Sequence, residues 1–175
     1  CKLLMRLHSK NLVMDKVEVI DNFLSKYHFD LLYSYFMGED MVWFYKNEIV
    51  KEGDGGFQFT AAICGEGKKF DTFSFIEPCI SRLGCNTIHA IKVNLRTRTL
   101  IHRRSQYHID FAEAPHNLKT AIYYINTCNG YTKFKKGGKV KSIANRMVIF
   151  NHSMEHAGVS CTDKKRRLVI NFNYE

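Results

Sequence analysis

A series of short β-segments fills the C-terminal half of the chain, and this feature limits the possible folds more than any other. The segments cover residues 86–98, 107–110, 118–126, 132–134, 140–143, 147–150, the residues from 156 onward, and 166–174. A lysine- and glycine-rich turn at 135–139 separates two of them. About eight short strands at this spacing indicate a β-sandwich of two sheets.

The N-terminal half predicts two helices and little sheet. A short strand from residue 17 leads into a helix with Ser25 as its N-cap and Gly38 at its end, and we expect the apolar residues between 27 and 36 in the core. A strand follows at 41–45 and a glycine-rich turn at 51–56. A second helix is expected at 73–83, where Pro78 shortens or kinks it. Both helices would cover one face of the main sheet.

The size of the chain favours one domain spanning residues 1–175. Residues 1–13 could be an extension, with Met14 as the natural start. There is no apolar run near the eighteen or so residues that a membrane span needs, and no signal peptide is visible. Six scattered cysteines form no Cys-x-x-Cys pair. They therefore predict reduced thiols in a cytoplasm and argue against a zinc site.

His108 and Asp110 are the first candidates for a metal site. On a strand, alternate side chains leave the same face, so the imidazole and the carboxylate would point together. A second imidazole from a distant strand would complete the two-histidine, one-carboxylate triad of non-haem Fe(II) oxygenases. His152 and His156 both compete for that third position. Small residues suit close approach beside a metal, which favours His156 because Ala157 and Gly158 follow it.

An arginine at the start of the last strand is the candidate for binding a carboxylate. Arg166 and Arg167 point to opposite faces, so only one can enter the space between the sheets. If Arg167 points inward, Val169, Asn171 and Asn173 follow it, and the polar lining suits a charged acid. If Arg166 points inward, the interior is apolar. We therefore favour Arg167 and keep Arg166 as the alternative anchor.

Several of these parts occur in an order that resembles a known family. The parts are His-x-Asp, a Tyr-Tyr strand, Gly-x-Thr, Asn-Arg…Phe…His-x-Gly and finally Arg-Leu-Val-Ile-Asn. This order resembles the 2-oxoglutarate- and Fe(II)-dependent dioxygenases, and within them the prolyl-4-hydroxylase-like branch with its compact bacterial and phage-encoded members. The resemblance is strongest over residues 88–174.

The resemblance implies a double-stranded β-helix (jelly-roll) core in a mainly β fold with flanking N-terminal helices. It implies that His108, Asp110 and His156 bind iron, and that Arg167 and Tyr124 bind the far carboxylate of 2-oxoglutarate. Fe(II), 2-oxoglutarate and O₂ would be required, with ascorbate as a further candidate. The expected reaction hydroxylates an unactivated C–H bond, foremost of a prolyl residue in a peptide or protein, and releases succinate and CO₂. A bacterial or phage-infected cytoplasm would be the setting.

Two other functions remain open. The net charge of +9, with Lys and Arg concentrated at 92–104, 133–141 and 164–167, fits oxidation or demethylation of a nucleic-acid base. No nucleic-acid-binding motif supports it, and no membrane partner is expected. The third reading is a catalytically idle, metal-binding jelly-roll that serves as an interaction module. Loops 46–57 and 97–106 are candidates for facing the substrate, as are Lys92 and Asn94.

Overall fold

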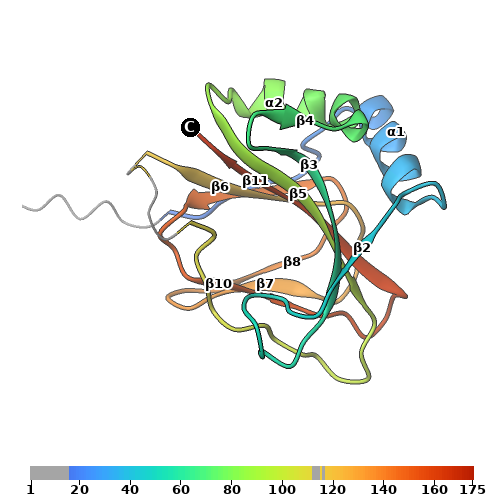
Figure 1. The fold of residues 1–175 in the computed structure, drawn as a ribbon, viewed down its shortest axis with the longest axis vertical. Coiled ribbons are helices and arrows are strands. Elements are labelled where there is room, and N and C mark those ends of the chain that lie inside the picture. The colour runs from blue at the N-terminus through green and yellow to red at the C-terminus, as the bar shows by residue number, and fades with distance from the viewer. Residues whose placement is uncertain (1–15, 112–114, 116) are drawn as a thin grey trace, which may run out of the picture.

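In the computed structural model, two β-sheets face each other and two helices cover the outer face of the larger sheet (Figure 1). The structure describes residues 16–111, 115 and 117–175. The expectation that residues 1–13 are an extension therefore lies outside the described residues. A mainly β fold with flanking N-terminal helices is confirmed. No described helix has the length and apolar character needed to span a membrane.

The larger sheet is built from eight strands of the described chain. These are β1 (Glu18–Ile20), β2 (Phe44–Lys46), β3 (Gln58–Gly65), β4 (Lys68–Lys69), β5 (Ile88–Thr97), β6 (Lys119–Tyr124), β9 (Arg146–Asn151) and β11 (Arg166–Tyr174). Their order is β1-β9-β6-β11-β5-β3-β2, and β4 pairs with β3. All pairs are antiparallel. The order places β11, the last strand of the chain, in the middle of the sheet.

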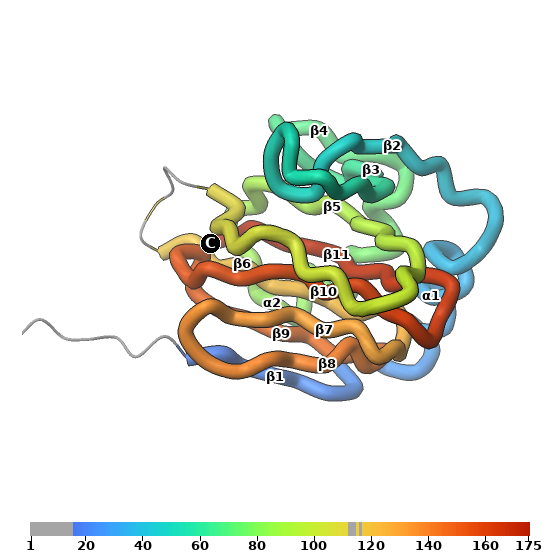
Figure 2. Tube along the Cα trace, turned by 90° about the horizontal axis from the view of Figure 1, so that it is seen from below, coloured from blue at the N-terminus to red at the C-terminus, as the bar shows by residue number. Residues whose placement is uncertain are grey.

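The smaller sheet contains β7 (Tyr131–Phe134), β8 (Lys139–Lys141) and β10 (His156–Val159), in the order β10-β7-β8. Figure 2, seen from below, shows these three strands lying across the larger sheet. The predicted turn at 135–139 joins β7 to β8, and the predicted extended run does begin at His156. The space between the two sheets is where strands from both halves bring polar side chains together.

Helix α1 (Lys26–Met37) begins and ends where the sequence predicted. The Ser25 hydroxyl accepts a hydrogen bond from the backbone N–H of His28 at 3.4 Å, and Gly38 is the C-cap. Only Leu32 and Phe36 are fully buried in it, whereas Tyr27 is 69% exposed. The prediction that all its apolar residues belong to the core is therefore wrong, because the helix contacts the sheet along one narrow stripe.

The second predicted helix is divided in two. Residues Asp71–Ile76 form a 3₁₀ helix, and α2 (Glu77–Leu83) then begins with a proline at its first or second position. Pro78 has no N–H and its ring would clash with the carbonyl of Ser74 in a continuous α-helix. A proline is tolerated only at the start of a helix, so α2 starts there. Gly84, with φ of 65°, ends it.

Strand β11 separates two apolar cores. Leu168, Ile170 and Phe172 belong to the core under the helices, together with Leu32 and Phe36 of α1. Val169 belongs to the core between the sheets, which also contains Phe134 and Phe150. Burying an apolar side chain of this size contributes roughly 1.5–3 kcal/mol. The cores therefore determine which face of β11 points between the sheets, and Val169 is on that face as predicted.

Two strand predictions need correction, and two strands were not predicted. β2 begins at Phe44 rather than at residue 41, and neither β3 nor β4 was predicted. Residues 107–110 form no strand: His108 makes one isolated bridge, to His156. β3 is stabilised by its pairing with β2 and β5, which its own sequence does not reveal. The segment at 107–110 lacks such continuous pairing with β10.

Candidate active site

His108, Asp110 and His156 lie together at one end of the space between the sheets. One ligand atom from each residue lies within 4.8 Å of the other two. The bridge between His108 and His156 brings the rings together, since each backbone N–H donates to the other residue's carbonyl at 3.0 Å. The ring centroids are 4.6 Å apart. We call these three residues the metal end of the pocket; His152 is not part of the cluster.

Hydrogen bonds assign the tautomer of both imidazoles. His108 Nδ1 donates to the carbonyl of Gln106 at 3.2 Å, and His156 Nδ1 donates to the carbonyl of Met154 at 3.1 Å. A carbonyl can only accept, so each ring carries its proton on Nδ1 and leaves Nε2 as the basic nitrogen. Backbone carbonyls commonly orient metal-binding histidines in this way.

The charge state of the metal end favours a bound cation. Burial lowers the pKa of His156, although Asp110 acts against this, so the ring is neutral at pH 7. The Asp110 side chain is only 4% exposed, and its Oδ2 atom has no hydrogen-bond partner in the described structure. A buried carboxylate oxygen without a partner is costly. Two imidazole nitrogens and this carboxylate therefore fit a divalent metal ion, and the donor set is that of non-haem Fe(II).

The other end of the pocket is organised around Arg167, which is 4% exposed. Its Nε donates to the Ser142 hydroxyl at 2.7 Å, and its Nη2 donates to the Thr132 hydroxyl at 3.2 Å. Tyr124 is fully buried and donates to the same Thr132 oxygen at 2.7 Å. We call Arg167, Tyr124, Thr132 and Ser142 the arginine end. Among the described residues, no carboxylate lies within ion-pair distance of Arg167.

Tyr124 remains a neutral hydroxyl at this end. Burial raises the pKa of the Tyr124 phenol, and this outweighs the opposing effects of the Arg167 charge and of the hydrogen bond to Thr132. The phenol oxygen lies beside the guanidinium, whose central carbon is 5.5 Å from the centre of the Tyr124 ring. The guanidinium has N–H groups left to donate to an incoming carboxylate, and the single proton of the Tyr124 hydroxyl could turn from Thr132 to do the same.

Arg166 and Arg167 leave opposite faces of β11. Arg166 reaches away from the pocket and donates to the carbonyl of Met37 at the end of α1. Arg167 enters the pocket beside Gly130, where a side chain would collide: an added Cβ would lie 2.7 Å from Cδ of Arg167. The arginine that sequence reasoning favoured as the anchor is therefore the one inside the pocket. Its binding role remains a prediction.

Both predicted loops contribute to the pocket wall. Ile49 comes from loop 46–57 and Ser105 from loop 97–106, and Lys92 and Asn94 project from β5. The amide oxygen of Asn94 is buried without a hydrogen-bond partner, as is that of Asn171 on β11. The pocket thus contains several polar groups that no described residue of the chain satisfies.

Sequence reasoning named neither Arg96, which lines the pocket, nor Ser142, which orients Arg167. A signal for Arg96 was present, because Lys92, Asn94 and Arg96 alternate with three apolar residues along β5. Ser142 had no such signal. Thr132 and Gly158 were named as parts of the motifs, but their contacts with Arg167 and their place in the pocket wall were not foreseen.

A second cluster of donor atoms joins Cys128, Cys161 and Asp163, whose ligand atoms lie within 4.8 Å of one another. The five described cysteines are all free, and the Cys161 thiol donates to the carbonyl of Lys164 at 3.3 Å. Three donors are one fewer than a structural zinc site uses. The cluster therefore does not change the expectation of reduced thiols.

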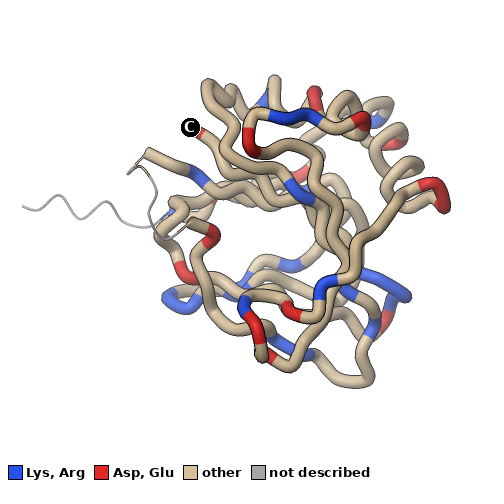
Figure 3. The backbone as a smooth tube through the Cα atoms, viewed as in Figure 1, with Lys and Arg blue, Asp and Glu red and all other residues tan. Residues whose placement is uncertain are grey.

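The positive charge of the protein is not gathered on one face. Figure 3 shows Lys and Arg on both sheets, on the helices and at several turns. The net charge of +9 therefore adds a general attraction for anions, and the specific cationic features are the two buried arginines of the pocket wall, Arg96 and Arg167.

Solved structures share this fold. A prolyl hydroxylase from Trichoplax adhaerens, in complex with a peptide fragment of hypoxia inducible factor, matches with a TM-score of 0.65 at 15% identity over 92% of this chain and 84% of that chain. A viral collagen prolyl hydroxylase from Paramecium Bursaria Chlorella virus-1 matches with a TM-score of 0.56 at 16% identity over 90% and 88%. A 2OG-Fe(II) oxygenase family protein from Burkholderia pseudomallei gives 0.62 at 8% identity over 90% and 84%.

At these identities the likeness establishes the fold. No protein-family model and no curated protein matches the sequence. The two facing sheets therefore form the double-stranded β-helix that the chain shares with these solved structures, as the sequence predicted.

Proposed function

We propose that this protein is an Fe(II)- and 2-oxoglutarate-dependent dioxygenase that hydroxylates a C–H bond of a prolyl residue in a peptide or protein. The observation that carries the proposal is the metal end, where two imidazoles with basic Nε2 atoms converge on a carboxylate oxygen that has no hydrogen-bond partner among the described residues. Arg167 lies in the same pocket, and no described residue supplies a carboxylate within ion-pair distance of it. A metal and a dicarboxylic acid would satisfy both ends at once.

His108, Asp110 and His156 would hold Fe(II), and Arg167 with Tyr124 would receive the far carboxylate of 2-oxoglutarate. Bound iron, 2-oxoglutarate and O₂ supply an oxidative decarboxylation to succinate and CO₂ that is coupled to hydroxylation. The chain itself contributes orientation: backbone carbonyls hold both imidazoles, and Thr132 and Ser142 hold Arg167. Ascorbate is a candidate for keeping the metal reduced.

The substrate class is supported by the solved structures. Prolyl hydroxylases are among those that share the fold, and the Trichoplax enzyme is bound to a peptide. We therefore infer a peptide or protein substrate. The free thiols of the described cysteines support a reducing compartment, and we propose the cytoplasm.

The first test is an anaerobic titration of the protein with Fe(II) and 2-oxoglutarate, followed by the weak visible charge-transfer band of the chelate. We expect a band in wild type that is lost in His156→Ala and kept in His152→Ala, which removes a buried histidine outside the cluster. If folded wild-type protein gives no band, the dioxygenase assignment is wrong and the metal-binding interaction module takes its place. Turnover of proline-containing peptides, measured as succinate, then tests the substrate.

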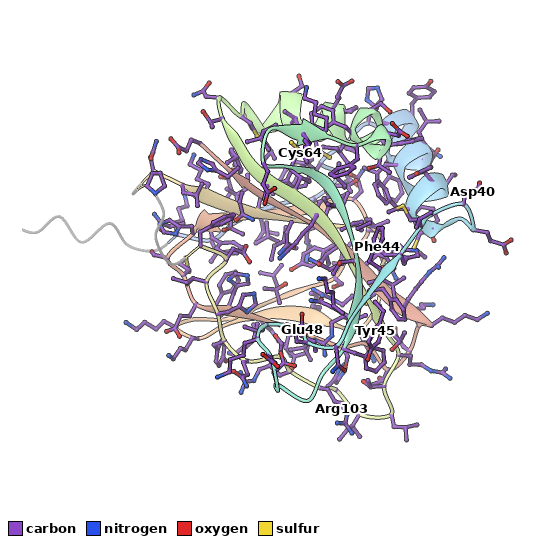
Figure 4. All side chains as sticks on the ribbon, viewed as in Figure 1. Asp40, Phe44, Tyr45, Glu48, Cys64 and Arg103 are labelled. Atoms are coloured by element: carbon purple, nitrogen blue, oxygen red, sulfur yellow. The ribbon has the colours of Figure 1, made fainter. Side chains whose placement is uncertain are left out.

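Oxidation of a nucleic-acid base is a second candidate, and an aromatic group beside the pocket favours it. Tyr45 directly precedes loop 46–57, and Phe57 is its last residue. The two side chains are 56% and 46% exposed, and their rings stack with centroids 5.9 Å apart. Figure 4 shows Tyr45 and Arg103 in the lower half of this view. Exposed aromatics near basic residues can stack single-stranded bases. Binding of an oligonucleotide that weakens steeply with salt would support this function, and peptide turnover without such binding would exclude it.

A further inference from the structure

A second buried arginine lines the pocket. Arg96 of β5 is 8% exposed and lies directly opposite Arg167 in the register between β5 and β11. Its Nη1 donates to the carbonyl of Gly158 at 2.8 Å and its Nη2 donates to the carbonyl of Arg103 at 3.3 Å. A guanidinium has five N–H groups, so three remain free. Arg96 has no ion-pair partner in the described part of the chain.

Placing two cations opposite each other on neighbouring strands is unfavourable. Burial and the nearby Arg167 charge lower the pKa of Arg96 to about 10, so Arg96 keeps its charge at neutral pH. Asp54 attracts Arg96 from a distance, but its own oxygens accept backbone N–H groups within loop 46–57. An anion between the two guanidiniums would remove the repulsion.

Gly158 leaves space for such an anion. A Cβ added at Gly158 would lie 3.7 Å from Nη1 of Arg167 and 3.7 Å from Nη1 of Arg96. One position in front of the glycine is therefore within reach of both guanidiniums, and no side chain of the described residues fills it. Because residues two apart on a strand share a face, this position is on the same side of β10 as the His156 ring.

The separation along β10 fits the length of a short dicarboxylic acid. Two residues of a strand advance about 6.6 Å, which is comparable to an extended five-carbon chain. A 2-oxo acid held by its proximal end near His156 would therefore bring its far carboxylate close to Gly158.

We propose that Arg96 is a second specificity-determining residue for the co-substrate: Arg96 and Arg167 together hold the far carboxylate of 2-oxoglutarate in the space before Gly158. This inference rests on the proposed function. It assigns selection of a dicarboxylic over a monocarboxylic 2-oxo acid to a pair of arginines on two neighbouring strands. Arg96 then has a role that differs from a purely structural connection between β5 and β10.

The test separates these roles with two ligands that differ in the far carboxylate. Anaerobic Fe(II)-loaded protein is titrated calorimetrically with 2-oxoglutarate and with 2-oxopentanoate, which has the same carbon chain and no far carboxylate. Removing a charged hydrogen-bond donor in Arg96→Met should weaken 2-oxoglutarate binding by about 10- to 100-fold. The affinity for 2-oxopentanoate should change by less than about threefold, because that ligand presents nothing to Arg96.

Arg98→Met is the matched control. Arg98 follows β5, is exposed and does not line the pocket, yet its removal changes the net charge equally. The affinity of this variant for each of the two ligands should differ from that of wild type by less than about twofold. Equal weakening of both ligands in Arg96→Met would show a structural role and overturn the inference, as would no weakening. Failure of wild type to bind either acid would overturn the proposed function as well.

Gly158→Ala keeps both arginines and tests the space itself. Its methyl group makes only ordinary contacts of 3.7 Å, so the variant should fold and its thermal unfolding should match wild type. The methyl group would occupy the position of the carboxylate, and 2-oxoglutarate affinity should fall by about tenfold or more while 2-oxopentanoate binding persists. Wild-type affinity for 2-oxoglutarate in this variant would place the carboxylate elsewhere.

Discussion

The metal end and the arginine end of the pocket are built in opposite ways. At the arginine end, hydroxyl groups of Thr132 and Ser142 already hold Arg167, and the side chains come from or adjoin regular strands. At the metal end, an oxygen of Asp110 has no partner among the described residues, the Nε2 atoms of both imidazoles are the basic nitrogens, and His108 and Asp110 come from residues 107–110, which form no strand. The Arg167 guanidinium is thus held in place by hydrogen bonds, while the imidazole and carboxylate lone pairs at the metal end are available to a ligand.

This difference has consequences for stability. An unpartnered buried carboxylate oxygen lowers the stability of the metal-free protein, whereas the hydrogen bonds around Arg167 already stabilise it. A metal that binds only the folded state adds stability, about 2.7 kcal/mol at a concentration of 100 times its Kd. A bound metal should therefore raise the free energy of unfolding through its contacts at the metal end. Substitutions at the arginine end should lower the free energy of unfolding, because they remove hydrogen bonds that are already formed.

Asp110→Ala should give the largest effect on function and a small one on folding. Turnover should fall by at least about 10³-fold, because one of three metal ligands is lost. The free energy of unfolding of the metal-free variant should be no lower than that of wild type, since a buried oxygen without a partner is removed. Succinate production and urea unfolding, each with and without Fe(II), measure both.

Glu155→Ala serves as its control, because it also removes a carboxylate but only an exposed one paired with Lys135. It should keep full turnover and the stabilisation by Fe(II). Retained turnover in Asp110→Ala would refute the assigned metal end, and a strong loss of metal-free stability would contradict the comparison of the two ends.

Arg167→Met should weaken 2-oxoglutarate binding by about 100-fold, whereas Arg166→Met should change it by less than about threefold. The reason is that the two side chains leave opposite faces of β11 and only Arg167 lines the pocket. Anaerobic calorimetry on the Fe(II)-loaded proteins measures this. The opposite ranking would assign the anchor to Arg166.

Gly130→Ala tests whether the arginine end is as rigid as its hydrogen bonds suggest. The new Cβ would lie 2.7 Å from Cδ of Arg167 and 2.9 Å from the carbonyl oxygen of Val159, which is backbone. We expect a loss of about 1–3 kcal/mol in the free energy of unfolding and weaker 2-oxoglutarate binding, with unchanged Fe(II) affinity. Gly138→Ala, where nothing lies within 4 Å, should change none of these. Weakened Fe(II) binding in Gly130→Ala would show that the two ends are coupled.

The smallest effect concerns the loop that brings Ile49 to the pocket wall. Burial raises the pKa of Asp54, but hydrogen bonds from four backbone N–H groups outweigh this, so the folded-state pKa lies below the unfolded value. Its contribution, at most about 1 kcal/mol, is present above the unfolded pKa and is lost as the pH falls through the folded pKa. The stability difference between wild type and Asp54→Ala should be constant from about pH 5 to 7 and shrink below about pH 4. A difference that stays constant to pH 2 would contradict the assignment.

Local chemistry was readable from the sequence. Ser25 and Gly38 mark the ends of α1, the turn at 135–139 forms the hairpin, and β11 points Val169 between the sheets. These features depend on capping, turn chemistry and strand alternation, which act over a few residues. His108, Asp110 and His156 were also identified as candidates for one metal, but from the order of their motifs, because the strand expected at 107–110 is not formed.

The relations between distant segments were decided only by the tertiary structure. His108 and Asp110 share a site although residues 107–110 form no strand, because the bridge to His156 brings this segment against β10. Arg96 and Arg167 meet because β5 pairs with β11 in one register, and Gly158 leaves the space between them because β10 faces both. Register and sheet packing sum many contacts across the chain, so no short segment contains them. The sequence by itself therefore determined which chemical groups are available, and tertiary packing determined which of them face one another.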